Sequence, residues 1–307
     1  MLEALGLIAR YGRFVLVGGL GAGLVLPGVA LALRPWLSEL VLLLLFLTAF
    51  RVGLPAALEG LNQTRNTLGV VLAYQLALPL LCIAVFAGFG LAQSPVAIAL
   101  TLMLSAPSVT ASPNMAVLLG HSPEPGFRLL ILGTLILPLT IIPIFWVSPA
   151  LGSLPEAIHA ALRLGLSICA TIALAFILRA VLRPDMHRSE IHALDGLTSL
   201  ALAVIVVGLM SAVAPALLTA PRTLAKWLVV ALVANLGIQT LAYLGLRRIG
   251  DARTAAPMAL VAGNRNVALF LVASTATQTD EFLLFLGCYQ FPMYLTPILM
   301  RRLFGRG

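Results

Sequence analysis

Two polar interruptions decide how this chain folds: Ala106-Pro107-Ser108-Val109-Thr110-Ala111-Ser112-Pro113-Asn114 and Gly263-Asn264-Arg265-Asn266. Each lies near the middle of a long apolar run, and Asn114 and Asn266 are 152 residues apart, about half of the 307-residue chain. Polar backbone at membrane depth is tolerated only where it lines a cavity or packs inside protein. Paired interruptions in two halves of a membrane protein indicate a transporter's binding site.

The composition is that of a membrane protein with many spans. Hydrophobic residues make up 61% of the chain, and the mean hydropathy is +1.06, which excludes an ordinary soluble domain. Runs of about 20 apolar residues, each long enough to cross about 30 Å of hydrocarbon, follow one another. We therefore predict an all-α polytopic fold with ten transmembrane helices at residues 14–33, 36–54, 67–91, 96–120, 127–147, 155–182, 194–218, 224–246, 255–276 and 281–303.

The net charge of +8 comes from arginines scattered over short loops, with Lys226 as the single lysine. Such scattering does not indicate a nucleic-acid partner, which would favour a clustered basic face. Most loop arginines fall on one predicted side of the membrane. The positive-inside rule then places both termini in the cytoplasm. The use of arginine over lysine hints at a GC-rich bacterial genome, and we expect the protein in a bacterial inner membrane.

An internal repeat relates the two halves of the chain. A shift of 152 residues places Asn114 on Asn266, and both begin the pattern Asn-x-Ala followed by apolar residues. Five spans per half is an odd number, so the second half must enter the membrane with the opposite orientation. The sequence predicts two inverted repeats, residues 1–153 and 154–307, with interrupted fourth and ninth helices.

The polar residues of the two interruptions are the candidates for binding a solute. Arg265 is the one ionisable residue predicted near the membrane midplane, where such residues usually mark a substrate or ion pathway. Its planar fork can hold an anionic group through two hydrogen bonds. The alternative is a structural arginine that donates to carbonyls of the opposing interruption. The predicted substrate-binding residues are Arg265, Asn264, Asn266, Ser108, Thr110, Ser112, Asn114, Gln75 and Gln290.

The chain resembles the bile acid:sodium symporter family over all ten spans. The matching stretches are Pro107-Ser108-Val109-Thr110-Ala111-Ser112, Gly263-Asn264-Arg265-Asn266 and Thr134-Leu135-Ile136-Leu137-Pro138-Leu139-Thr140-Ile141-Ile142-Pro143. This resemblance implies a core of spans 3–5 and 8–10, inside which the two broken helices cross. It also implies a panel of spans 1, 2, 6 and 7 that moves against the core, and transport of organic anions, commonly with sodium.

The departures from the family concern sodium. Val261 stands where the family has an acidic residue that is important for sodium, and Arg265 stands where it has a glutamine. Gln75 is one residue out of register with the family's glutamine, counted from Pro79. A fixed guanidinium repels a neighbouring cation. The neutral polar groups of Ser112, Asn114, Asn264 and Asn266 are the candidates for a weak sodium site. We expect no other cofactor or metal.

These observations favour a secondary active transporter of a small organic anion that works by alternating access, with sodium as the candidate coupling ion. Membrane lipid and the anion are the expected partners. A sodium-independent anion carrier, either proton-coupled or facilitated, is one alternative. An integral membrane enzyme is another, but the sequence has no paired acids at metal-ligand spacing, and we expect no enzymatic activity. A passive channel or receptor fits the paired interruptions less well. Substrate identity, direction of transport and oligomeric state are not encoded in any pattern that we recognise.

Overall fold

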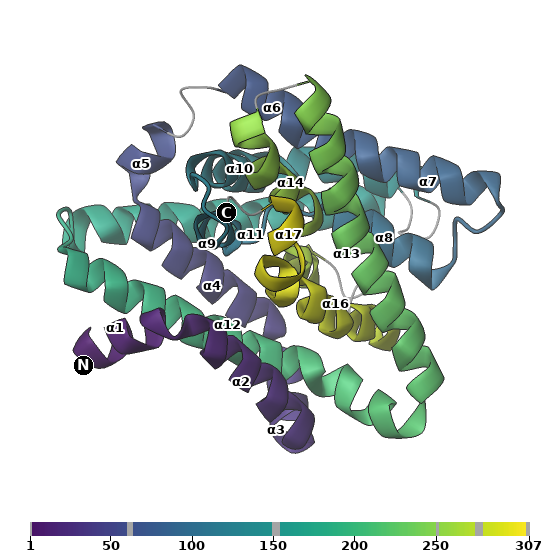
Figure 1. Ribbon diagram of the computed structural model, residues 1–307, viewed down its shortest axis with the longest axis horizontal. Helices are drawn as coiled ribbons and strands as arrows, with labels where there is room; N and C mark the ends of the chain where they lie inside the picture. The colour runs from purple at the N-terminus through teal and green to yellow at the C-terminus, as the bar shows by residue number, and fades with distance from the viewer. Residues whose placement is uncertain (1, 60–63, 149–153, 250–251, 274–278, 305–307) are drawn as a thin grey trace.

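The computed structural model describes residues 2–59, 64–148, 154–249, 252–273 and 279–304. Within these ranges the chain is helical with short connections, and no strand occurs (Figure 1). The single β-type contact there is an isolated antiparallel bridge between Ser108 and Arg265. The prediction of an all-α fold is therefore confirmed for the described part of the chain.

The helices of the first half are α1 (Leu2–Arg10), α2 (Gly12–Val25), α3 (Pro27–Leu33), η1 (Arg34–Trp36), α4 (Leu37–Val52), α5 (Leu54–Glu59), α6 (Thr64–Leu72), η2 (Ala73–Ala77), α7 (Leu78–Gly88), α8 (Pro95–Ser105), α9 (Ser112–Leu118) and α10 (Glu124–Val147). Those of the second half are α11 (Leu154–Leu182), α12 (Arg188–Thr219), α13 (Pro221–Ile249), α14 (Ala252–Gly263), η3 (Val267–Leu269), α15 (Phe270–Ala273), α16 (Asp280–Leu299) and α17 (Arg301–Phe304).

Seven helical stretches in the described residues are long and apolar enough to cross a membrane. They are Pro27–Val52, Asn66–Gly88, Glu124–Val147, Leu154–Leu182, Arg188–Thr219, Pro221–Arg248 and Asp280–Leu299. A further pair, Glu3–Arg10 with Phe14–Val25, would form an eighth span but is bent by 82°. The chain is thus a multi-pass, α-helical membrane protein by length and composition of its helices.

The first predicted span, residues 14–33, is divided in the structure. Helix α2 ends at Val25, and α3 begins at Pro27 and continues through η1 into α4. Proline lacks the N–H that would continue the preceding helix, yet its fixed φ suits the first turn of a new one. The break therefore falls at Leu26 rather than near Trp36, where the sequence placed it.

A π-helix interrupts the span that contains Gln75. Residues Ala73–Ala77 form η2, and the N–H of Leu78 bonds to the carbonyl of Ala73, five residues earlier. Pro79 explains this widening, because it has no N–H to donate to the carbonyl of Gln75 four residues before it. Single π-turns of this kind occur frequently at functional sites. Here the π-helix carries Tyr74 and Gln75, both of which are buried.

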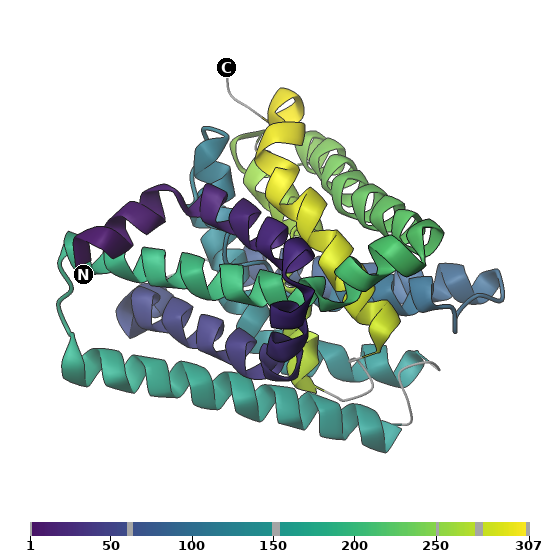
Figure 2. The same cartoon turned by 90° about the horizontal axis from the view of Figure 1, so that it is seen from below.

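The helices pack as two groups. In the panel group, α1, α2, α3 and α4 all contact the long helix α12, and α11 contacts α4. In the core group, α13 packs along α14 and α16, and α10 packs against α6, α9 and α14. Figures 1 and 2 show α4 beside α12, and α16 between α12 and α13. The groups meet where α16 contacts α12 and where α10 contacts α11.

Polar contacts tie the panel group together at the end of α4. The guanidinium of Arg51 forms an ion pair with Asp195 of α12, with 3.2 Å between Nη2 and Oδ2. Arg179 of α11 donates through Nη1 to the carbonyls of Phe50 and Arg51, at 2.9 and 3.1 Å. A cation at a helix C-terminus is favoured by the helix dipole. The three helices are therefore joined by charged side chains as well as by apolar packing.

Candidate functional site at the crossing of the two breaks

The two interruptions lie against each other in the structure. The N–H of Val109 donates to the carbonyl of Asn264 at 3.0 Å, and the N–H of Asn266 donates to the carbonyl of Pro107 at 2.8 Å. Helices α8 and α14 end on either side of this pairing. Their 11 and 12 residues correspond to about 16–18 Å, roughly half of the hydrocarbon thickness. Each break thus supplies the backbone partners that the other lacks.

The contact between the breaks is a different relation from the proposed repeat, which aligns residues of the two halves without placing them side by side. Ser108 lies opposite Arg265, 157 residues away in the chain. Asn114, which the proposed repeat aligns with Asn266, belongs to α9 and is exposed. The Asn-x-Ala match therefore relates residues that occupy different surroundings.

Arg265 is the central side chain of the crossing and is only 2% exposed. Its Nε donates to the carbonyl of Ala262 at 2.8 Å, and its Nη1 donates to the carbonyl of Ala106 at 3.0 Å. The guanidinium carbon lies 5.0 Å from the centre of the Tyr74 ring, within the range of a cation–π contact. Nη2 has no hydrogen-bond partner among the described residues. Two guanidinium nitrogens thus bond to backbone carbonyls, and the third is buried without a partner among the described residues.

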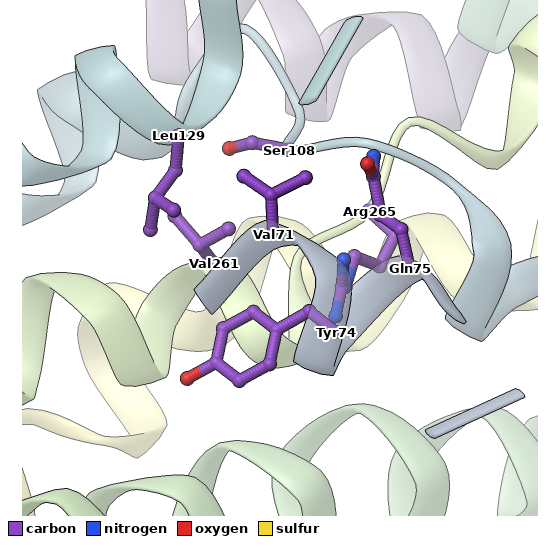
Figure 3. A pocket seen from close by; sticks show the side chains of 7 residues that line it. All are labelled: Val71, Tyr74, Gln75, Ser108, Leu129, Val261 and Arg265. Atoms are coloured by element: carbon purple, nitrogen blue, oxygen red, sulfur yellow. The ribbon is translucent and has the colours of Figure 1, made fainter. Parts of the chain in front are cut away.

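A small pocket adjoins this guanidinium (Figure 3). Its cavity volume is about 10 Å³, the space of about one water molecule. Its lining consists of Val71, Tyr74, Gln75, Ser108, Leu129, Val261 and Arg265. The amide Nε2 of Gln75 donates to the carbonyl of Gly133 at 3.3 Å, whereas its Oε1 has no partner within the described chain. The pocket therefore has one charged donor and one amide acceptor without partners, beside the apolar side chains of Val71, Leu129 and Val261.

A second pocket lies between the panel group and the crossing. Its cavity volume is about 30 Å³, the space of about two water molecules. Apolar side chains of α4 and α12 form one wall, and residues of the second break and α16 form the other. Its polar members are Arg265, Asn266, Tyr289 and Gln290.

A buried hydrogen-bond network supports the second break from the side of α13 and α16. Nδ2 of Asn235 donates to the carbonyl of Gly263 at 2.6 Å and to Oδ1 of Asn264 at 3.1 Å. Nε2 of Gln239 donates to Oδ1 of Asn235 at 2.7 Å. The Tyr289 hydroxyl donates to the same Gly263 carbonyl and accepts from the N–H of Arg265 at 2.9 Å. The non-helical backbone is thereby held in one conformation.

The structure brings some predicted site residues together and separates others. Gln75, Ser108 and Arg265 share the small pocket, and Asn266, Gln290 and Arg265 share the larger one. Asn264 is fully buried in the network with Asn235. Thr110 is half-buried and lines neither of these pockets, and Asn114 is exposed.

The predicted sodium ligands also face different surroundings. Asn264 accepts from Asn235 and Thr296, Asn266 faces the larger pocket, and Asn114 lies exposed on α9. Ser112 is buried, and its hydroxyl has no partner among the described residues. The four residues therefore do not line one common pocket of the two described above.

The sequence analysis left two tyrosines out of the predicted site. Tyr74 lies against the guanidinium, and Tyr289 bonds to the backbone of the second break. The available signal was their position immediately before Gln75 and Gln290. A tyrosine within an apolar run needs a partner for its hydroxyl, so each could have been placed beside the broken backbone.

Comparison with known proteins finds no protein-family model that matches the chain and no curated protein similar to it. Within the described ranges, no group of three or more His, Cys, Asp or Glu side chains is arranged to hold a metal ion.

Proposed function

We propose that this protein is a secondary active transporter of a small organic anion that works by alternating access. The observation that carries the proposal is the crossing of two broken helices at a buried backbone bridge. Irregular backbone inside a membrane protein is stable only where protein or a cavity surrounds it, and transporters bind their solutes at such places. The resemblance of the two break sequences to those of the bile acid:sodium symporter family agrees with this proposal.

The proposed topology has ten spans in two inverted repeats. Counting the bent pair α1–α2 and the broken pairs α8–α9 and α14–α15 as one crossing each brings the seven long helices to ten. In this proposal the panel group moves relative to the core group. The larger pocket lies at their boundary, so such a movement would change its access from one face of the membrane to the other.

An anionic substrate is supported by the free donor at the small pocket. Nη2 of Arg265 is buried without a partner, and no described carboxylate forms an ion pair with this arginine. A charged donor left unpaired in an apolar site is costly, so an anion that reaches it gains a strong hydrogen bond. Gln75 can donate or accept beside it.

A ligand screen tests this proposal. We expect a small organic acid to raise the unfolding midpoint of the purified protein, whereas the uncharged amide of the same acid does not. At a concentration tenfold above Kd the stabilisation is about 1.4 kcal/mol, a shift of about 3 °C. The best acid is then tested for uptake into proteoliposomes. Equal shifts with acid and amide, or a binding acid that is never taken up, would contradict the proposal.

The orientation of the chain is a second expected result. Single cysteines at Gln93 and Asp185, in a variant without the native Cys82, Cys169 and Cys288, should be labelled from opposite faces of the membrane. Gln93 lies in the loop after α7 and should react from the periplasm, whereas Asp185 lies between α11 and α12 and should react from the cytoplasm. Labelling of both residues from the same face would exclude the proposed ten-span topology.

A sodium-independent carrier is the alternative that one observation favours. Arg265 places a permanent positive charge against the carbonyls at the crossing, where a sodium ion would be repelled. This observation leads to the inference below.

A further inference from the structure

Two helix C-termini converge at the crossing. Helix α8 ends at Ser105, and the carbonyl of the next residue, Ala106, lies just beyond its last turn. Helix α14 ends at Gly263, and the carbonyl of Ala262 lies in its last turn. Each helix C-terminus carries about half a negative elementary charge, so the two ends together carry about one negative charge.

The guanidinium of Arg265 donates to a carbonyl at each of these two helix ends. Arg265 donates to the carbonyl of Ala262 at 2.8 Å and to that of Ala106 at 3.0 Å. It contacts no carboxylate in the described part of the chain that would otherwise neutralise it. Its charge of plus one, which arginine keeps in proteins, matches the partial charges of the two helix ends in magnitude and opposes them in sign.

Converging carbonyls and half-helix C-termini are the groups with which broken membrane helices bind sodium or other cations. We propose that Arg265 is a tethered cation that permanently fills a cation site formed by the carbonyl ends of α8 and α14. The chain therefore carries this positive charge covalently, and no mobile cation binds there. This inference concerns binding and stability, and it stands whether or not the proposed anion transport is correct.

Removal of the side chain should expose the site. Arg265→Ala leaves the Ala106 and Ala262 carbonyls without their donor and opens a space beside the Tyr74 ring, whose face attracts cations. A free guanidinium ion has the size, charge and planar donors of the missing group. It should therefore bind to the variant, and sodium should bind there with lower complementarity.

Thermal unfolding of the purified protein in detergent tests this expectation at constant ionic strength, set with choline chloride. Replacing choline by tens of millimolar guanidinium should raise the midpoint of Arg265→Ala by about 3 °C or more. The midpoint of the unchanged protein should not rise with guanidinium or sodium. Urea, a neutral molecule of similar shape, and the variant Arg222→Ala, which removes an exposed arginine of α13, are the controls.

A lack of any cation-dependent rise in folded Arg265→Ala would overturn the inference, as would an equal rise in Arg222→Ala. If Arg265→Ala does not fold, binding of radioactive sodium to the unchanged protein tests whether a mobile cation occupies the site. We expect no saturable binding up to tens of millimolar sodium. The variants Asn264→Ala and Asn266→Ala leave the Ala106 and Ala262 carbonyls unchanged. Saturable sodium binding that persists in both variants would show that a mobile ion occupies the carbonyl site, and would exclude Arg265 as its tethered cation. Neither measurement uses transport, so a failure here is distinct from a failure of the proposed function.

Discussion

Arg265→Lys should lower the initial rate of anion uptake at least about tenfold in proteoliposomes that contain equal amounts of folded protein. The guanidinium contacts Ala262 and Ala106 through two different nitrogens and keeps a third nitrogen free. A lysine ammonium is a single point donor and cannot occupy all three positions. The loss of one hydrogen bond to a charged group costs about 1.5–3 kcal/mol, and each 1.4 kcal/mol is about tenfold.

The matched control for this experiment is Arg222→Lys, on the exposed beginning of α13. It makes the same chemical change far from the crossing in sequence and should leave uptake unchanged. The anion for the assay is the acid that gives the largest thermal shift in the ligand screen. Wild-type uptake by Arg265→Lys would show that positive charge alone is sufficient, and that the planar fork has no part in substrate binding.

The location of the breaks was predictable from the sequence, because prolines and amides within apolar runs contradict a continuous helix. Pro107 and Asn264 lie where two half-helices pair their backbones. The pairing partner was not predictable. The repeat aligned Asn114 with Asn266 in sequence, but such an alignment does not say which residues touch, and the bridge joins Ser108 to Arg265. Such a match carries little positional information, because small and apolar residues recur throughout a membrane protein.

The surroundings of Gln75 show a second limit of sequence reasoning. By its spacing from Pro79, this residue is one position out of register with the family's glutamine. The structure has a π-helix at Ala73–Ala77, and a π-turn accommodates one additional residue in a helix. Gln75 consequently lines the small pocket with Arg265. The proline was visible in the sequence, but whether it produces a kink or a π-turn depends on the neighbouring helices.

The two roles considered for Arg265 were an anchor for an anion and a structural arginine. Two of its nitrogens donate to carbonyls, which is the structural role, and the third has no partner among the described residues; the anchor role stays a prediction. No spacing rule distinguishes these cases, because the direction of a long side chain depends on the packing around it. The same holds for Asn264, whose amide faces Asn235 rather than either pocket.

Gly263→Ala should produce the largest loss of stability among single-methyl substitutions at the crossing. A Cβ atom on Gly263 would lie 2.2 Å from the carbonyl oxygen of Asn235 and 2.5 Å from Cγ of Gln239. The Gln239 side chain can turn away, but the oxygen belongs to the backbone of α13 and cannot. Overpacking of this kind costs about 3 kcal/mol, which corresponds to a fall of about 6–12 °C in the unfolding midpoint.

The control is Gly237→Ala in the same helix α13, where an added Cβ would meet no atom within 4 Å. Alanine favours a helix over glycine by about 1 kcal/mol, so this variant should unfold at the same temperature or slightly higher. The opposite signs separate a steric effect at the crossing from the general effect of a glycine replacement. An unfolding midpoint of Gly263→Ala equal to that of Gly237→Ala would contradict the close approach of α13 and α14 at the break. It would also contradict the hydrogen bond from Asn235 to the Gly263 carbonyl, which requires that approach.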